Sequence, residues 1–300
     1  MPDLCVVVST RNRGPAVVGT LRSLLAEPDP KLEVVVIDQS DDETTGAAIR
    51  EAFVDPRLRY ERSPRRGISA GRNEGTALSR APIVAMTDDD CAAVAGFVCR
   101  VRDAFSDPRV ALVFGSVLPG PHDRRLGLIP ACLVREPYVG TRLRDKVNLD
   151  GMGACMAFRR DLWISLEGFD ESLGAGSPLL AGEETDFCLR SLLAGRTVLL
   201  TPRIEVVHHG FRPMASVGDL VRGYWFGTGA VFVKLFRCGH VAVGGLVVRL
   251  AWRSLLGASP VARSLMGAAT RRARLIAFGR GVLAGSRLPV DASSGHFKRG

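Results

Sequence analysis

Short apolar runs alternate with amphipathic stretches over the first 115 residues. The runs at 4–8, 32–37 and 81–86 end abruptly at polar residues, which is typical of buried strands. After the first run, Val17 and Leu21 begin a pattern of apolar residues at helical spacing. The same patterns predict strands at 58–61 and 110–114 and helices at 67–79 and 94–105. The alternation predicts an α/β fold, with a mostly parallel sheet that carries helices on both faces.

The periodicity is weaker in the middle of the chain. Residues 116–149 are rich in Pro, Gly and Arg and are expected to form a long surface excursion. A strand of small residues at 151–158 would let a ligand approach the backbone closely. The remaining pattern predicts a helix around Leu162, a helix that begins near Gly182, and short strands at 197–201 and 204–209.

Three consecutive carboxylates, Asp88, Asp89 and Asp90, follow the apolar run at 81–86. Open α/β sheets bind ligands at the carboxyl ends of their strands. Adjacent carboxylates repel one another unless a cation or a row of donors compensates them, and hard oxygen ligands suit Mg²⁺ or Mn²⁺. Such a cation would in turn suit a diphosphate. A solvated acidic turn that caps the next helix explains the triplet equally well.

The charge of the chain is unevenly distributed. The 300 residues carry a net charge of +9, but residues 211–300 hold 14 Lys and Arg against 2 acids, whereas residues 1–210 hold 26 against 29. A basic C-terminal region favours an anionic partner, either membrane or nucleic acid. The seven scattered cysteines include no C-x-x-C pair and indicate reduced core residues. The N-terminus lacks the features of a signal peptide, so we expect a cytoplasmic protein.

Apolar positions at helical spacing recur, edged by basic residues, at 217–236, 241–256 and 262–283. None of these runs approaches the ~20 uncharged apolar residues of a membrane span. Basic amphipathic helices favour the interface of an anionic bilayer, and the residues expected to insert are Trp225, Phe226, Phe232 and Trp252. A helical subdomain packed on the core is the alternative. No nucleic-acid-reading motif is present, so we expect no nucleic acid partner. Residues 289–300 are polar and expected to be frayed.

Four motifs together resemble the nucleotide-sugar-binding half of the family 2 glycosyltransferases, which have a GT-A fold. They are V-V-V-S-T-R-N-R at 6–13, V-V-V-I-D-Q-S at 34–40, G-I-S-A-G-R-N-E-G at 67–75 and T-D-D-D at 87–90. The resemblance implies a metal-dependent, inverting enzyme that transfers a sugar from a nucleoside-diphosphate sugar to a hydroxyl of a glycan, lipid-linked or other acceptor.

The resemblance also implies roles for individual residues near the donor. Thr10 and Asp38 would lie around the nucleobase, Arg72 near the nucleotide, Asp88 at the ribose or diphosphate, and Asp90 on Mg²⁺ or Mn²⁺. The full donor-binding set expected on this basis is Thr10, Arg11, Asp38, Gln39, Arg72, Asp88 and Asp89, and the metal set is Asp90, Asp88 and His208.

The stretch at 182–190 resembles the acceptor-side motif of the family, in which a Glu-Asp pair at a helix start carries the catalytic base. This chain has Glu184 where Asp is usual, so the base is expected to be Glu184, with Glu183 as its neighbour. Without the family, favourable pairing with the helix dipole would explain both acids. The pattern P-x-x-x-x-x-H that begins at Pro202 points to His208 at the metal or diphosphate, with His209 second.

Two other functions compete with this one. The sequence G-I-S-A-G at 67–71 matches the G-x-S-x-G elbow of a serine hydrolase that would use Ser69. The elbow needs a strand directly before the serine, however, and the basic loop at 62–66 intervenes, so Ser69 is better explained as a helix N-cap. A catalytically inactive scaffold on the membrane is the third hypothesis.

The expected organisation has three parts. Residues 1–115 form the nucleotide-sugar-binding half, and residues 116–210 form the acceptor-binding and catalytic half of the same domain. Residues 211–300 form the basic helical region, which contacts an anionic membrane through residues 217–283. The protein would then lie peripherally on the inner face of the cell membrane.

Overall fold

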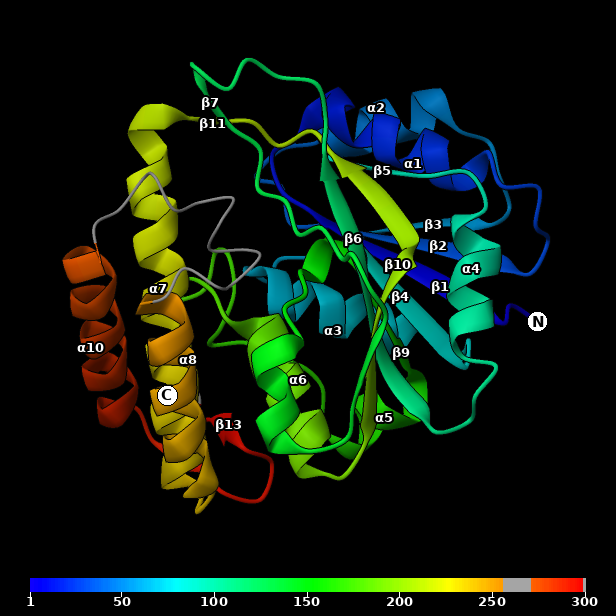
Figure 1. Cartoon of the computed structure of the whole chain (residues 1–300). Helices are drawn as coiled ribbons and strands as arrows, with labels where there is room; N and C mark the ends of the chain where they lie inside the picture. Colours follow the sequence, from blue (N-terminus) through cyan, green and yellow to red (C-terminus); the bar gives the residue numbers. More distant parts are fainter. Residues whose placement is uncertain (256–270, 299–300) are drawn as a thin grey trace.

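The computed structural model describes residues 1–255 and 271–298. A large sheet with the strand order β3-β2-β1-β4-β9-β6-β10-β5 forms its centre, and β8 pairs with β10 beside it (Figure 1). Six of these nine strands run in one direction, and β5, β8 and β9 run in the other. The strands are β1 (Leu4–Thr10), β2 (Leu32–Asp38), β3 (Leu58–Arg62), β4 (Ile83–Asp88), β5 (Cys91–Ala93), β6 (Val110–Pro119), β8 (Tyr138–Gly140), β9 (Met156–Arg159) and β10 (Thr197–His208).

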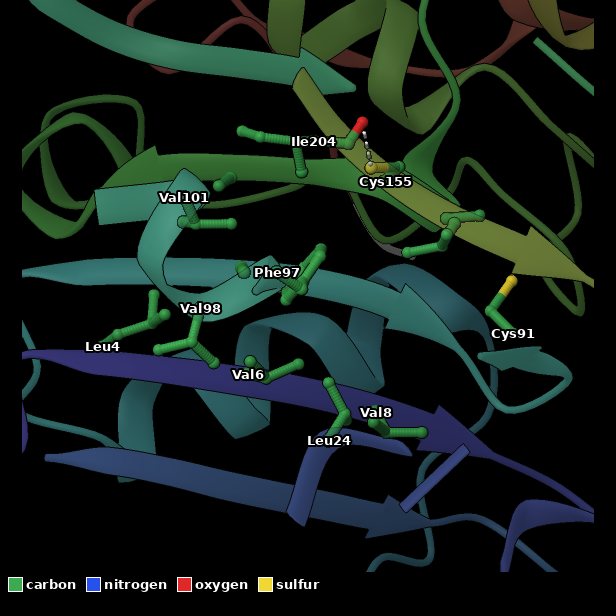
Figure 2. Close-up of a cluster of buried hydrophobic side chains, with 14 of the residues drawn as sticks. Leu4, Val6, Val8, Leu24, Cys91, Phe97, Val98, Val101, Cys155 and Ile204 are labelled. Carbon is green, nitrogen blue, oxygen red and sulfur yellow. Dashed lines mark hydrogen bonds between the residues drawn. The ribbon is translucent and has the colours of Figure 1, made fainter. Parts of the chain in front are cut away.

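Helices cover both faces of the sheet, which confirms the predicted fold class. In β1, Leu4, Val6 and Val8 face one apolar cluster, and Cys5 and Val7 face the other. Because successive side chains of a strand point to opposite faces, a strand buried on both sides is apolar throughout. Figure 2 shows the first cluster, where side chains of β1 meet those of α1 and α4. The helices on that face are α1 (Val17–Leu25), α2 (Thr44–Ala52) and α4 (Phe97–Ala104), and those on the other are α3 (Ile68–Leu78), α5 (Arg160–Ser165) and α6 (Glu183–Leu193).

The strand order places the polar strand ends together. β1 lies between β2 and β4, so Thr10 is opposite Asp38 on one side, and Ser9 is opposite Asp88 on the other. The chain leaves β1 in one direction across the sheet and returns on the other side, which creates the crevice where open α/β sheets bind ligands.

The middle of the chain is more ordered than its composition indicates. Residues 116–149 contain β8, the short strand β7 (Gly127–Leu128) and the 3-10 helix η2 (Leu143–Asn148), and Cys132 and Leu149 are buried there. The two strands predicted at 197–201 and 204–209 form the single strand β10. Its register against β6 shifts between Leu200 and Glu205, a span that contains Pro202, which has no N–H for the ladder.

The C-terminal region consists of helices that lie beside the sheet domain (Figure 1). They are α7 (Met214–Arg237), α8 (Ala242–Leu255) and α10 (Arg271–Arg287). The apolar side of α7 is buried within the protein through Val217, Val221, Val231, Phe232 and Leu235, so a packed subdomain forms from the residues expected to face a membrane. Among the described helices, none has the length and apolar character needed to cross a bilayer. Trp252, which was expected to insert into the membrane, is not among the described side chains. The start of the helix predicted at 262–283 also falls outside the described residues.

Close contacts join α7 to α10. A side chain on Gly229 would come within 2.2 Å of the Phe278 carbonyl oxygen, and one on Gly281 within 1.9 Å of the Phe226 carbonyl oxygen. Only glycine permits backbones to approach so closely. The orientation of α10 against α7 is therefore fixed.

A buried ion network fastens α7 to the rest of the protein. The Lys234 ammonium lies 2.7 Å from both Asp170 Oδ2 and Asp186 Oδ1, and Arg190 Nε donates to Asp186 Oδ2 at 2.8 Å. The N–H of Phe297 donates to Asp170 Oδ2 at 2.9 Å. Residues expected to be frayed thus form a hairpin, β12 (Val290–Asp291) and β13 (His296–Phe297), that is docked on this network.

Candidate active site

A cavity of about 720 Å³ opens where the carboxyl ends of β1 and β4 meet α3, α6 and α7. It gathers ten of the eleven residues that the sequence singled out. These are Thr10, Arg11, Gln39, Arg72, Asp88, Asp89, Asp90, Glu183, Glu184 and His208. They come from segments far apart in the chain, so their convergence is a property of the fold.

Asp38 does not line this cavity. Its carboxylate is fully buried, accepting hydrogen bonds from the Tyr60 hydroxyl at 2.8 Å and from the Ser40 N–H at 2.9 Å. Burial and the neighbouring Asp38 raise the pKa of Tyr60 to about 12, so the phenol keeps its proton and continues to donate. In this structure Asp38 therefore holds the loop that follows β2.

The acidic triplet has the predicted position, because Asp88 ends β4 and Asp89 and Asp90 form the turn before β5. Arg13 compensates part of their charge, with Nε 3.1 Å from Asp89 Oδ1 and Nη2 3.1 Å from Asp90 Oδ2. Burial raises the pKa of Asp89 to about 6 against the opposing effect of Arg13, and burial also raises that of Asp88. The triplet is thus only partly neutralised. Sequence reasoning missed Arg13, whose signal is its place in the polar loop after β1.

His208 is oriented toward the triplet. Its Nδ1 lies 2.8 Å from the Pro130 carbonyl oxygen and donates to it, while its Nε2 lies 3.1 Å from Asp90 Oδ1. Although burial disfavours the charged ring, the hydrogen bond to Asp90 raises the pKa of His208 above its usual value. A neutral ring would direct a lone pair at the carboxylate, so a proton or a cation must lie between them. The alternative, His209, is exposed and does not line the cavity.

Cys91 joins Asp90 and His208 in a group whose ligand atoms lie within 4.8 Å of one another. Its thiol is buried in the apolar core, and burial raises its pKa, which disfavours the thiolate that binds metals. The donors that suit a hard cation here are the carboxylate and the imidazole.

Arg72 connects the two sides of the cavity. Its buried guanidinium lies 2.9 Å from Glu183 Oε1 and 3.2 Å from Asp88 Oδ1. Gly71 lets α3 pack directly on Ser9 of β1, and Gly153 leaves the room that the guanidinium fills. The small residue at 153, expected to admit a ligand, therefore admits a side chain of the protein.

Glu183 and Glu184 begin α6, after Gly182 with a φ of 96°. The carboxylate of Glu183 is paired with Arg72, whereas Glu184 is partly exposed and lines the cavity. Burial, followed by the adjacent Glu183, raises the pKa of Glu184. Asp186 is fully buried in the ion network and lies outside the cavity lining. Of these three acids, Glu184 has the carboxylate best suited to accept a proton.

Ser69 lacks the geometry of a nucleophile. Its hydroxyl is fully buried, donates to the Leu173 carbonyl oxygen at 2.7 Å, and does not line the cavity. The predicted N-cap role is also wrong, because Gly67 occupies that position with a φ of 99° and Ser69 lies inside the first turn. Neither finding favours hydrolase chemistry.

The C-terminal helices, which sequence reasoning had assigned to a membrane surface, form another wall of the cavity. The lining side chains there are mostly apolar or aromatic, with one arginine. They are Leu220, Val221, Tyr224, Trp225, Thr228 and Phe232 of α7 and Arg274, Leu275 and Phe278 of α10.

Solved structures with a similar fold include a mannosyltransferase. The mannosyltransferase PcManGT from Pyrobaculum calidifontis, in complex with GDP-Man and Mn²⁺, matches with a TM-score of 0.61 at 20% identity over 98% of this chain and 77% of its own. S. aureus TarS 1-349 matches with a TM-score of 0.56 at 17% identity over 78% of this chain and 66% of its own. At these identities the similarity shows the fold.

Sequence relatives agree with the structural ones. The glucosyl-dolichyl phosphate glucuronosyltransferase of Haloferax volcanii is 27% identical over 218 residues, 69% of each chain. The succinoglycan biosynthesis protein ExoU of Rhizobium meliloti is 32% identical over 89 residues, 29% of this chain and 26% of its own. The family model for glycosyl transferase family 2 matches residues 5–165, more than half of the sequence. The chain belongs to glycosyl transferase family 2 and is a glycosyltransferase.

Proposed function

We propose that this enzyme is a metal-dependent, inverting glycosyltransferase that moves a sugar from a nucleoside-diphosphate sugar to an acceptor hydroxyl. One observation carries the proposal: a single cavity holds the acidic triplet with His208 on one side and the Glu184 carboxylate on the other. Leaving-group stabilisation and proton removal are the two requirements of a direct displacement, and the cavity offers residues for both.

The donor would bind along the carboxyl ends of β1 and β4. Thr10, Arg11 and Gln39 supply polar groups for the nucleoside, and Arg13 and Arg72 supply positive charge near the diphosphate. This assigns most donor contacts to residues 1–115. Residues 116–210 contribute His208 beside the diphosphate and Glu183 and Glu184 on the acceptor side.

The residues at the triplet fit a divalent cation. Asp90 and His208 already require a positive charge between them, and Asp88 adds a carboxylate on the same strand end. Oxygen and imidazole donors suit Mn²⁺ or Mg²⁺. When bound, such a cation would neutralise charge on the departing diphosphate.

Glu184 would act as the general base. The acceptor oxygen forms a bond to the anomeric carbon, the bond from that carbon to the diphosphate oxygen breaks, and the acceptor proton passes to the Glu184 carboxylate. A single displacement of this kind inverts the anomeric configuration. The pairing of Glu183 with Arg72 supports Glu184 over its neighbour.

Relatives indicate the class of donor and acceptor. Similar structures contain GDP-Man, UDP-GlcNAc and UDP, and the Haloferax relative is named for a dolichyl phosphate-linked substrate. We therefore propose a nucleoside-diphosphate sugar as donor and a lipid-linked or polysaccharide acceptor in glycan biosynthesis.

The outer side of α10 supports attachment to the inner face of the cell membrane. Leu275, Ile276 and Leu283 are exposed there, and Arg271 and Arg280 are exposed beside them. Figure 1 shows α10 on the outside of α7, away from the sheet. Exposed aliphatic side chains among arginines complement an anionic bilayer.

Nucleotide binding with and without Mn²⁺ tests the proposed reaction. UDP and GDP are titrated by calorimetry into the wild type, Asp90→Asn and the exposed control Asp219→Asn. At least one nucleotide is expected to bind the wild type and the control only when Mn²⁺ is present, and Asp90→Asn is expected to lose this binding. Unchanged metal-dependent binding by Asp90→Asn would remove the metal role from this residue.

A further inference from the structure

Arg274 is a buried cation that forms no ion pair with any acidic side chain in the described part of the chain. Of the three buried arginines in residues 1–255 and 271–298, Arg72 pairs with Glu183 and Asp88, and Arg190 pairs with Asp186. Arg274 is 7% exposed, and its Nε has no hydrogen-bond partner within the same part of the chain. A buried guanidinium nitrogen with no partner is unfavourable, and an anionic ligand that accepts its hydrogen bond removes this cost.

This arginine faces the cavity. It lines the end formed by α7 and α10 and lies one turn before Phe278 on α10. The buried stripe of α10 continues from Arg274 through Ala277, Gly281 and Gly285. Since the glycine contacts fix α10 against α7, the arginine is held at the cavity by the packing of the helix.

The wall around Arg274 is apolar. Phe278 packs edge-on against Trp225, with ring centroids 6.4 Å apart, and its ring centroid lies 6.3 Å from that of Phe232. All three line the cavity together with Leu275. Leu275 is also 55% exposed, so the cavity reaches the surface of α10 at this residue.

We propose that this end of the cavity binds a phosphorylated lipid, with Arg274 as the ligand of its phosphate and the aromatic wall as the contact of its apolar chain. The proposal rests on the function proposed above and assigns the acceptor to the class of lipid phosphates or pyrophosphates that carry a sugar, whose hydroxyl is the acceptor group. A guanidinium recognises a phosphate by charge-assisted hydrogen bonds, and the neighbouring apolar wall requires that the phosphate carry a hydrocarbon chain.

The cavity geometry favours this ligand over a free glycan. A neutral carbohydrate without lipid can stack on Trp225 or Phe278 but leaves Arg274 without an anion and the exposed aliphatic side chains of α10 without a partner. In a lipid phosphate that carries a sugar, the sugar with the acceptor hydroxyl points along the cavity toward Glu184, and the chain leaves past Leu275. The exposed aliphatic side chains of α10 lie at that exit.

Short-chain probes test the proposal on the whole protein. Farnesyl phosphate, farnesol and inorganic phosphate are titrated by calorimetry below the micelle concentration of each lipid. Farnesyl phosphate is expected to bind at least about tenfold more tightly than either other probe, since a hydrogen bond to a charged group and burial of the chain both contribute. If farnesol binds as tightly, Arg274 recognises no phosphate and the proposal fails. If inorganic phosphate binds as tightly, the site is one for a free anion and the lipid is wrong.

Matched variants separate Arg274 from general surface charge. Arg274→Gln is expected to lower the affinity for farnesyl phosphate about tenfold or more while leaving farnesol binding unchanged, and Arg274→Lys is expected to retain part of the affinity. Arg287→Gln, on the exposed side of the same helix, is expected to bind as the wild type does. Equal loss in both glutamine variants, or no loss in Arg274→Gln, would overturn the assignment.

The two proposals fail separately in this design. Metal-dependent nucleotide binding is measured on every variant and is expected to be unaffected by Arg274→Gln, which also shows that the variant is folded. If the protein binds nucleotide but does not prefer farnesyl phosphate, the proposed reaction stands and the lipid acceptor is contradicted. If the protein prefers farnesyl phosphate through Arg274 but binds no nucleotide, the lipid site stands and the proposed reaction is contradicted.

Discussion

Replacement of Lys234 by Met tests the buried ion network that fastens α7 to the sheet domain. The wild-type network is neutral, with Lys234 and Arg190 against Asp170 and Asp186. Met has a similar volume, so the change removes mainly the charge. Asp186 keeps Arg190 as a partner, but Asp170 becomes a buried carboxylate with no cation beside it.

The expected loss follows from the contacts. Each 2.7 Å contact of the Lys234 ammonium is worth roughly 6 kcal/mol at an effective dielectric constant of about 20, before desolvation is subtracted. Desolvation offsets much of this, and loss of one member of a buried ion pair costs about 3–5 kcal/mol of unfolding free energy. At about 2–4 °C per kcal/mol, Lys234→Met should lower Tm by roughly 6–20 °C.

Thermal unfolding followed by circular dichroism at pH 7.5 measures this loss. Lys298→Met serves as the control, because Lys298 is exposed and, within the described residues, bonds through its backbone N–H to the Pro289 carbonyl oxygen. The double variant Lys234→Met, Asp170→Asn should regain part of the lost stability, because it removes the unpaired carboxylate and keeps an amide for the Phe297 N–H. A Tm for Lys234→Met equal to that of the control, or a double variant less stable than the single one, would refute the electrostatic reasoning.

Three further predictions concern catalysis and membrane attachment. Glu184→Gln should leave nucleotide binding near wild type and lower turnover by about 100-fold or more, whereas equal turnover would move the base to another residue. Because burial raises the pKa of Glu184 above the ordinary value of a carboxyl and a base must be deprotonated, kcat/KM should rise about tenfold per pH unit below the raised pKa and level off above it. A profile already flat from pH 6 would exclude Glu184 as the group that titrates. Binding to vesicles with anionic lipid should weaken steeply as salt rises, and Arg271→Gln with Arg280→Gln should weaken it further at low salt, since surface charges are screened within a Debye length of about 10 Å at 0.1 M. Salt-independent sedimentation with neutral vesicles would contradict this attachment.

Local patterns in the sequence were sufficient to place the strands β1, β2 and β4 and the polar residues that follow them. The apolar runs of β1, β2 and β4 are buried on both faces, and such strands are apolar at every position. The polar residues that follow them must leave the core, so the acidic triplet could be placed at a strand end without a structure. Gly71 and Gly75 lie where α3 contacts Ser9 and Val7 of β1, and a larger side chain at either position would collide with the strand. This close packing of helix and strand is therefore visible in the sequence as two glycines.

Only the tertiary structure decided which distant groups meet. Asp38 follows an apolar strand just as Asp88 does. Its carboxylate, however, accepts a hydrogen bond from Tyr60 on the neighbouring strand and does not line the cavity. Arg13 pairs with residues more than seventy positions later, which no local spacing encodes. The apolar side of α7 has the same pattern whether it covers a lipid surface or another helix, because burial depends on the partner and periodicity does not reveal it. The partners here proved to be α10 and the ion network, and their packing left Arg274 at the cavity wall, where it faces the space between the helices.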